Sequence, residues 1–198
     1  MPVADRLKTL LAADAPDASE IADLLDRASA GDRLDAVRAL GGVRLQRALW
    51  NAAANAPAVA IDDLVPPDAA PLREFIYEGK NSLPAFTIFQ KRFCRPSTPD
   101  AAGTLWGYNH TNIGSLVGPG YFLCHPVDDR GAAIDYRDVP PAHPAAWPAV
   151  RPNSQGLSWF VYRDMIDYLR RVSEHVFIGS ASRHGKDLGS YFVLCRAS

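Results

Sequence analysis

The sequence lacks most of the features by which a function can be recognised, and the first of these is cysteine. Only three cysteines are present, Cys94, Cys124 and Cys195, and none forms a CxxC pair. Their odd number and wide spacing argue against a disulfide framework and against a local zinc site. His125 follows Cys124, but neighbours on a strand point to opposite faces, so the sequence does not predict a cysteine nucleophile with its base.

The chain also lacks an excess of charge and a long apolar run. Its formal net charge is −1, which gives no electrostatic reason to expect nucleic-acid binding. Every apolar run is shorter than the stretch of about 18 residues that a spanning helix needs, and the first residues form no apolar signal segment. We therefore expect a cytoplasmic protein that binds neither nucleic acid nor a membrane, and the sequence leaves its oligomeric state open.

Metal-binding motifs are missing as well. None of the five histidines has HxH, HxxxH or HxxE spacing, so we predict no metal site. No cofactor is predicted either. A single histidine of a barrel can nevertheless ligate heme iron, and His110 or His175 could do so here.

What the sequence does contain is two patterns of apolar residues, of which the first is helical. Within residues 1–56, Ile21, Leu24 and Leu25 recur at helical spacing after a capping box that begins at Asp17. These residues form stripes too wide to leave in water, so we predict that the helical segment docks on the rest of the chain. The prolines of residues 57–71 predict an extended linker.

From residue 72 onward the period changes to two, which is typical of strands. Phe89, Lys91 and Phe93, for example, fall on one strand face. Further strand-like runs are 105–110, 121–127, 133–136, 157–163, 166–172, 176–182 and 188–196. A proline-rich loop at 140–152 lies between the third and the fourth of these runs. The run 166–172 also fits a helix, but its alternation continues that of its neighbours, which favours a strand. We predict an α+β protein in which residues 72–198 form an antiparallel β-barrel.

The C-terminal residues 157–198 carry a resemblance to a known family. The run Tyr162–Val172, the pair Ile178-Gly179 and the run Tyr191–Arg196 resemble the terminal meander of the small bacterial lipocalin-like (calycin-type) barrel proteins. The GxWxG signature of that family is echoed only in part, by Leu105-Trp106-Gly107-Tyr108-Asn109. The resemblance implies a closed barrel whose cavity holds one small ligand.

The segment 106–112 is the strongest candidate for a binding site. Trp106, Tyr108 and His110 share one strand face, and we predict that they line the barrel interior near its open end. The alternative is that the aromatic residues fill a core while residues 109–112 form a turn. The predicted ligand-binding residues, including three at the rim, are Trp106, Tyr108, His110, Lys80, Asn81 and Asn112.

Three functions remain open at this point. The leading hypothesis is a protein that binds a small hydrophobic molecule. The second is an isomerase or cyclase that uses the same cavity, with His110 or His175 as acid and base because imidazole titrates near neutrality. The third is an interaction module whose helices recruit a partner while the barrel serves as scaffold. Fold alone does not choose among them, so enzymatic activity stays uncertain.

Overall fold

The computed structural model describes residues 1–84, 87–98, 103–111, 118–128, 131–153 and 162–197. The helices are α1 (Val3–Leu11), α2 (Ala18–Arg27), α3 (Ala30–Arg38), α4 (Gly42–Ala52), the 3-10 turn η1 (Ala53–Asn55) and α5 (Ile61–Leu64). The strands are β1 (Phe75–Asn81), β2 (Ile88–Cys94), β3 (Leu105–His110), β4 (Tyr121–Pro126), β5 (Ala132–Asp135), β6 (Met165–Arg171), β7 (Val176–Arg183) and β8 (Lys186–Arg196).

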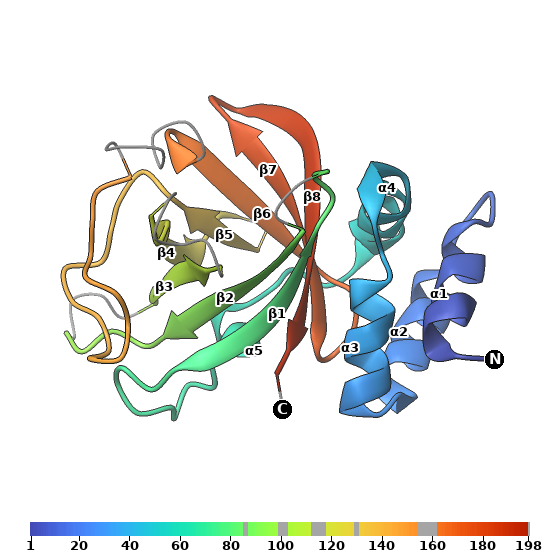
Figure 1. The fold of residues 1–198 in the computed structure, drawn as a ribbon, viewed down its shortest axis with the longest axis horizontal. Helices are drawn as coiled ribbons and strands as arrows, with labels where there is room; N and C mark the ends of the chain where they lie inside the picture. The colour runs from blue at the N-terminus through green and yellow to red at the C-terminus, as the bar shows by residue number, and fades with distance from the viewer. Residues whose placement is uncertain (85–86, 99–102, 112–117, 129–130, 154–161, 198) are drawn as a thin grey trace.

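The strands form a closed antiparallel barrel in which each strand pairs with its neighbour in the chain (Figure 1). Strand β8 returns to pair with β1, with Leu194 opposite Gly79, and this pairing closes the sheet. The β7–β8 turn passes through His184 and Gly185, whose φ angles of 51° and 75° are those of a tight two-residue hairpin turn. The predicted α+β class and closed antiparallel sheet are confirmed, and segment 166–172 forms a strand.

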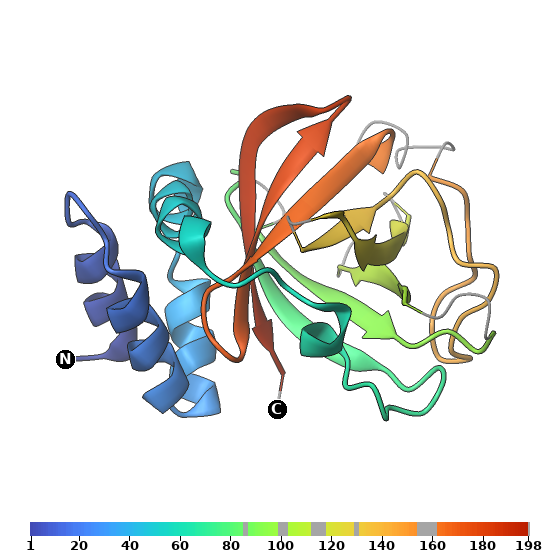
Figure 2. The ribbon, with the colours of Figure 1, turned by 180° about the vertical axis from the view of Figure 1, so that it is seen from behind.

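The N-terminal helices pack against the outside of the barrel (Figure 2). Two of them begin at side-chain caps: Asp17 accepts a hydrogen bond from the Ser19 amide at 2.8 Å, and Ser29 accepts one from the Asp32 amide at 3.1 Å. Their apolar faces share one core cluster with outward residues of the last two strands, such as Ile178. The predicted docking of the helical segment is thus confirmed, and its cause is the burial of these apolar stripes.

Segment 57–71 contains the short helix α5 where an extended linker was expected. Leu64 and Val65 of this segment are fully buried among the inward side chains of the barrel. The Tyr77 hydroxyl donates a hydrogen bond to the Leu64 carbonyl at 2.8 Å. Because its apolar residues cover the end of the barrel interior, the segment closes that end while it connects α4 to β1 (Figure 2).

Two further sequence expectations concern the long connection between β5 and β6. The proline-rich loop expected at 140–152 has no helix or strand, as predicted. The strand expected over 157–163 falls mostly outside the described residues. The two described positions, Tyr162 and Arg163, lie just before β6 and are not in a strand.

Three inward glycines make room for phenylalanine rings inside the barrel. Each glycine lies directly opposite a phenylalanine of the neighbouring strand, and the pairs are Gly79↔Phe89, Gly107↔Phe122 and Gly179↔Phe192. A Cβ atom on any of these glycines would lie 2.1–2.5 Å from the nearest ring carbon. The rings therefore lie over the glycines, and the small residues allow a narrow barrel to contain many aromatic side chains.

We expect Gly107→Ala to destabilise the fold, because its Cβ would also lie 2.6 Å from the Arg92 carbonyl oxygen, which is backbone and cannot rotate away. The expected loss is about 1–3 kcal/mol, the usual cost of overpacking a core. The matched control is Gly31→Ala in α3, where the nearest atom lies 4.0 Å away. Denaturant unfolding should show equal or higher stability for the control, and a Gly107→Ala protein as stable as wild type would contradict this packing.

Candidate ligand-binding cavity

The barrel interior contains a cavity of about 400 Å³ at the end opposite α5. Its wall is mainly aromatic and aliphatic and includes the side chains of Phe89, Tyr136, Tyr162, Met165 and Phe192. Its mouth is bordered by Asn81, Leu83, Arg183 and Leu188, where β1, β7 and β8 end or begin. The volume and the apolar wall fall within the ordinary range of small-molecule sites, about 300–1,000 Å³.

A buried lysine lies on the cavity wall. The Lys91 side chain is 2% exposed, and its ammonium donates a hydrogen bond to Asn109 Oδ1 at 3.0 Å. It also donates to the Tyr136 hydroxyl and forms an ion pair with Asp167 Oδ2 at 3.4 Å. An ammonium has three donor hydrogens, so these three acceptors account for all of them.

Aromatic rings surround the same ammonium. Its nitrogen lies 4.6 Å from the ring centre of Phe192, 5.1 Å from that of Tyr136 and 5.2 Å from that of Phe122. A cation near the face of an aromatic ring is attracted by the ring quadrupole, and the attraction is larger where water is excluded. The aromatic wall thus partly replaces the hydration that Lys91 loses.

Burial shifts the pKa of each member of the ion pair. Desolvation lowers the pKa of Lys91 and raises the pKa of Asp167, while the opposite charge of each partner counteracts the shift. Relative to the unfolded chain, both shifts favour the neutral forms, so ionisation of the pair costs stability at neutral pH. Burial also raises the pKa of Tyr136 well above its usual range, so this phenol stays protonated.

Asp167 has one oxygen for which the described residues provide no hydrogen-bond donor. Its Oδ2 receives the Lys91 ion pair and a hydrogen bond from the Tyr136 hydroxyl at 3.2 Å. Its Oδ1 is buried and has no hydrogen-bond partner among the described residues. An unpaired buried acceptor is costly, which makes this oxygen an unusual feature of the cavity wall.

Trp106, Tyr108 and His110 do not face the interior, so the predicted orientation of these side chains was wrong. The register pairs Lys91 with Asn109, and alternation along β3 then turns the other three side chains outward. Trp106 and Tyr108 pack in a separate outer cluster with Trp147 of the proline-rich loop. A role of these three residues in ligand binding stays an untested prediction.

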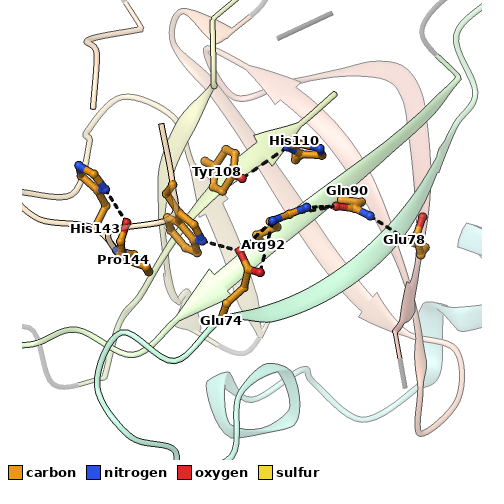
Figure 3. A network of polar contacts seen from close by, with 9 residues as sticks. Glu74, Glu78, Gln90, Arg92, Tyr108, His110, His143 and Pro144 are labelled. Carbon is orange, nitrogen blue, oxygen red and sulfur yellow. Dashed lines mark hydrogen bonds and ion pairs between the residues drawn. The ribbon is translucent and has the colours of Figure 1, made fainter. Parts of the chain in front are cut away.

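The outer face carries its own polar network (Figure 3). Arg92 contacts Glu74 at 3.1 Å and Gln90 at 2.7 Å, and Gln90 donates to Glu78 at 2.8 Å. The hydroxyl of Tyr108 lies 3.5 Å from His110 Nδ1 (Figure 3). Burial and the nearby Arg92 charge lower the pKa of His110. The Trp147 indole also donates to Glu74, at 2.5 Å, so the network ties the proline-rich loop to the barrel.

The other predicted site residues are distributed around the barrel. Asn81 lines the cavity mouth as predicted for the rim, whereas Lys80 lies outside the cavity lining and its carbonyl accepts a hydrogen bond from Gln46. Asn112 lies outside the described residues. His175 lies in the β6–β7 turn, at the end of the barrel where Arg171 pairs with Asp63 of α5. Neither His110 nor His175 lines the cavity, so neither is placed to be an acid, a base or a heme ligand inside it.

The sequence reasoning missed the cluster of ionisable side chains on the cavity wall that is formed by Lys91, Tyr136 and Asp167. One signal was available. Lys91 lies between Phe89 and Phe93 on a strand face that is otherwise apolar. If this face points inward, the charge of Lys91 is buried, and if it points outward, the two phenylalanine rings are exposed. No comparable signal marks Asp167, because charged residues lie on both sides of it in the sequence.

Comparison with known proteins gives no further guide: no protein-family model, curated protein or solved structure matches the chain. Among the residues that the structure describes, no helix is both long and apolar enough to span a membrane. In the same part of the chain, no three histidine, cysteine or acidic side chains come together as metal ligands. The closed antiparallel barrel and its cavity are therefore the observations from which a function must be argued.

We expect replacement of either member of the ion pair alone to destabilise the protein strongly. Lys91→Met or Asp167→Leu leaves a buried charge without its partner, which costs about 3–5 kcal/mol. The double variant removes both charges and should be as stable as wild type or more stable, because a buried ion pair rarely exceeds apolar packing in stability. Urea unfolding at pH 7 measures all three, and a double variant clearly less stable than wild type would contradict this account.

We expect Trp106→Ala to affect stability and not the cavity. The side chain is 1% exposed within the outer cluster, so its loss should cost about 3–5 kcal/mol. Binding of an apolar fluorescent dye, measured where the variant is still folded, should keep its wild-type affinity. Loss of dye binding with little change in stability would instead place Trp106 at the binding site.

Proposed function

We propose that this protein binds a small, mainly hydrophobic molecule inside its barrel, in the manner of lipocalin-like proteins. The observation that carries the proposal is the cavity of about 400 Å³, open at one end and lined by apolar residues around a few polar groups. An apolar wall supplies affinity through burial, and convergent polar groups fix the orientation of the ligand.

The closed end of the barrel supports the same proposal. Leu64 and Val65 are fully buried and close one end, so a molecule bound in the cavity enters and leaves by the other. A barrel that served only as a scaffold for the helices would gain stability from a filled interior. The unfilled part of this interior favours binding over the scaffold hypothesis.

An enzyme is the second candidate, and one observation favours it. Lys91, Tyr136 and Asp167 gather on the cavity wall, and buried ionisable groups with shifted pKa values are frequent at catalytic sites. Acid–base chemistry in the cavity would then use Asp167 rather than a histidine. Mass spectrometry distinguishes the two candidates, because a binding protein returns an incubated ligand chemically unchanged.

Binding in the barrel can be tested with the dye N-phenyl-1-naphthylamine, whose fluorescence increases in an apolar site. We expect the wild-type protein to bind one dye molecule and Ala181→Phe to lose at least tenfold in affinity, because residue 181 lines the cavity. The control, Ile88→Phe, adds an aromatic ring at an outward position that is 47% exposed and should bind as wild type does. Equal dye binding by both variants would show that the dye binds elsewhere.

A further inference from the structure

We propose that the ligand carries a neutral hydrogen-bond donor, such as a hydroxyl group, that binds Asp167 Oδ1 at the inner end of the cavity. The inference rests on the proposed function and names the chemical class of the ligand: an apolar body with one uncharged donor group. It follows from the hydrogen bonds within the cluster of Lys91, Asn109, Tyr136 and Asp167, in which Asp167 Oδ1 is the buried atom without a partner among the described residues.

Lys91 is not the main polar contact for a ligand, because its hydrogen-bond donors already have acceptors within the protein. Its three donor hydrogens are accounted for by Asn109, Tyr136 and Asp167, so a ligand acceptor would have to displace one of these partners. The Tyr136 hydroxyl likewise accepts from Lys91 and Asn109 and donates to Asp167. Within this cluster, the atom with unused hydrogen-bonding capacity is an acceptor, so the matching ligand group is a donor.

Asp167 lies on the cavity wall with its Oδ1 buried, so a ligand reaches this acceptor once the carboxylate turns toward the cavity. The residue is part of the cavity wall, with Ala181 opposite it on β7 also lining the cavity. The χ2 torsion of an aspartate is broad, so a small rotation of the carboxylate turns Oδ1 toward a donor in the cavity. A hydrogen bond to an ionised carboxylate is among the stronger ones, particularly where water is excluded.

The charge of the cluster determines that the donor is neutral. Lys91 and Asp167 together carry no net charge, and Asn109 and Tyr136 add none. A cationic ligand would place a second positive charge beside Lys91, and an anionic ligand would place a second negative charge beside Asp167. Either charge would be buried without a free partner within this cluster, which costs far more than burial of a hydroxyl group.

A matched series of probes tests the inference on the wild-type protein. The probes are 2-naphthol, 2-methoxynaphthalene, 2-naphthoate and 2-(aminomethyl)naphthalene, each measured by displacement of N-phenyl-1-naphthylamine at pH 7. They share one apolar body and differ in whether they carry a neutral donor, no donor, a negative charge or a positive charge. We expect 2-naphthol to bind at least tenfold more tightly than each of the others.

The variant Lys91→Met with Asp167→Leu should abolish the preference for 2-naphthol while 2-methoxynaphthalene still binds. The control is Asp135→Asn, which alters an equally buried carboxylate that pairs with Arg137 outside the cavity, and it should keep the preference. If the double variant does not fold, a crystal structure of the wild-type complex replaces it. The naphthol oxygen must then lie within hydrogen-bond distance of an Asp167 carboxylate oxygen.

The outcomes separate this inference from the proposed function. Equal affinity for 2-naphthol and 2-methoxynaphthalene would overturn the inference and leave binding in the barrel intact. This is the result expected if a water molecule donates the hydrogen bond to Oδ1. Tightest binding of 2-naphthoate would also overturn it and would point to Arg183 at the mouth. Tightest binding of the amine would overturn the requirement for neutrality. If neither the dye nor any probe binds, both the inference and the proposed function fail.

Discussion

The arrangement inside the barrel depends on the need to satisfy one buried ammonium. Lys91 lies on β2, and its three acceptors come from β3, from the residue that follows β5, and from β6. These segments meet around one nitrogen only because the sheet is closed and their inward residues converge. The ion pair therefore fixes the relative positions of strands that are far apart in the sequence. It also lies between the half of the interior toward α5, which side chains fill, and the half toward the mouth, which contains the cavity.

The two halves differ because of the side chains that point inward. Toward α5, the interior is packed with aromatic rings in edge-to-face contact. The ring centre of Tyr77 lies 5.5 Å from that of Phe93 and 5.9 Å from that of Phe177. Such aromatic contacts fill a narrow interior efficiently. Beyond Lys91 toward the mouth, the inward positions combine the rings of Phe89 and Phe192 with small or polar residues such as Asn81 and Ala181, and together these side chains do not fill the space. The cavity is thus a consequence of side-chain size along the strands.

Much of the fold could be read from the sequence because it depends on periodicity. The helical spacing of Ile21 and Leu25 and the alternation of Phe89, Lys91 and Phe93 each reflect burial of one face, which is a local property of the chain. The short helix α5 was missed because prolines flank it and it has only one turn. Its stability comes from packing on the barrel end, and no local pattern shows that contact.

The site could be predicted only in part because alternation gives two faces without saying which is inside. On β3 the face with Trp106 and Tyr108 had the composition of a pocket, yet the interior receives Gly107 and Asn109. The reason is a contact between strands: Phe122 occupies the space over Gly107, so the inward residue there must be small. The outer aromatic residues are buried instead by Trp147, which the proline-rich loop brings from about 40 positions along the chain.

The buried polar cluster is more informative about function than about stability. Apolar residues of similar size at positions 91 and 167 would pack as well and would avoid the desolvation of two charges. Within the part of the chain that the structure describes, the carboxylate also keeps one oxygen without a hydrogen-bond partner, which a network serving only to join the strands would not require. Both costs fall on the wall of the open cavity and not in the packed half of the barrel. This coincidence is explained if the cluster orients a ligand, because unused hydrogen-bonding capacity is useful only where another molecule can reach it.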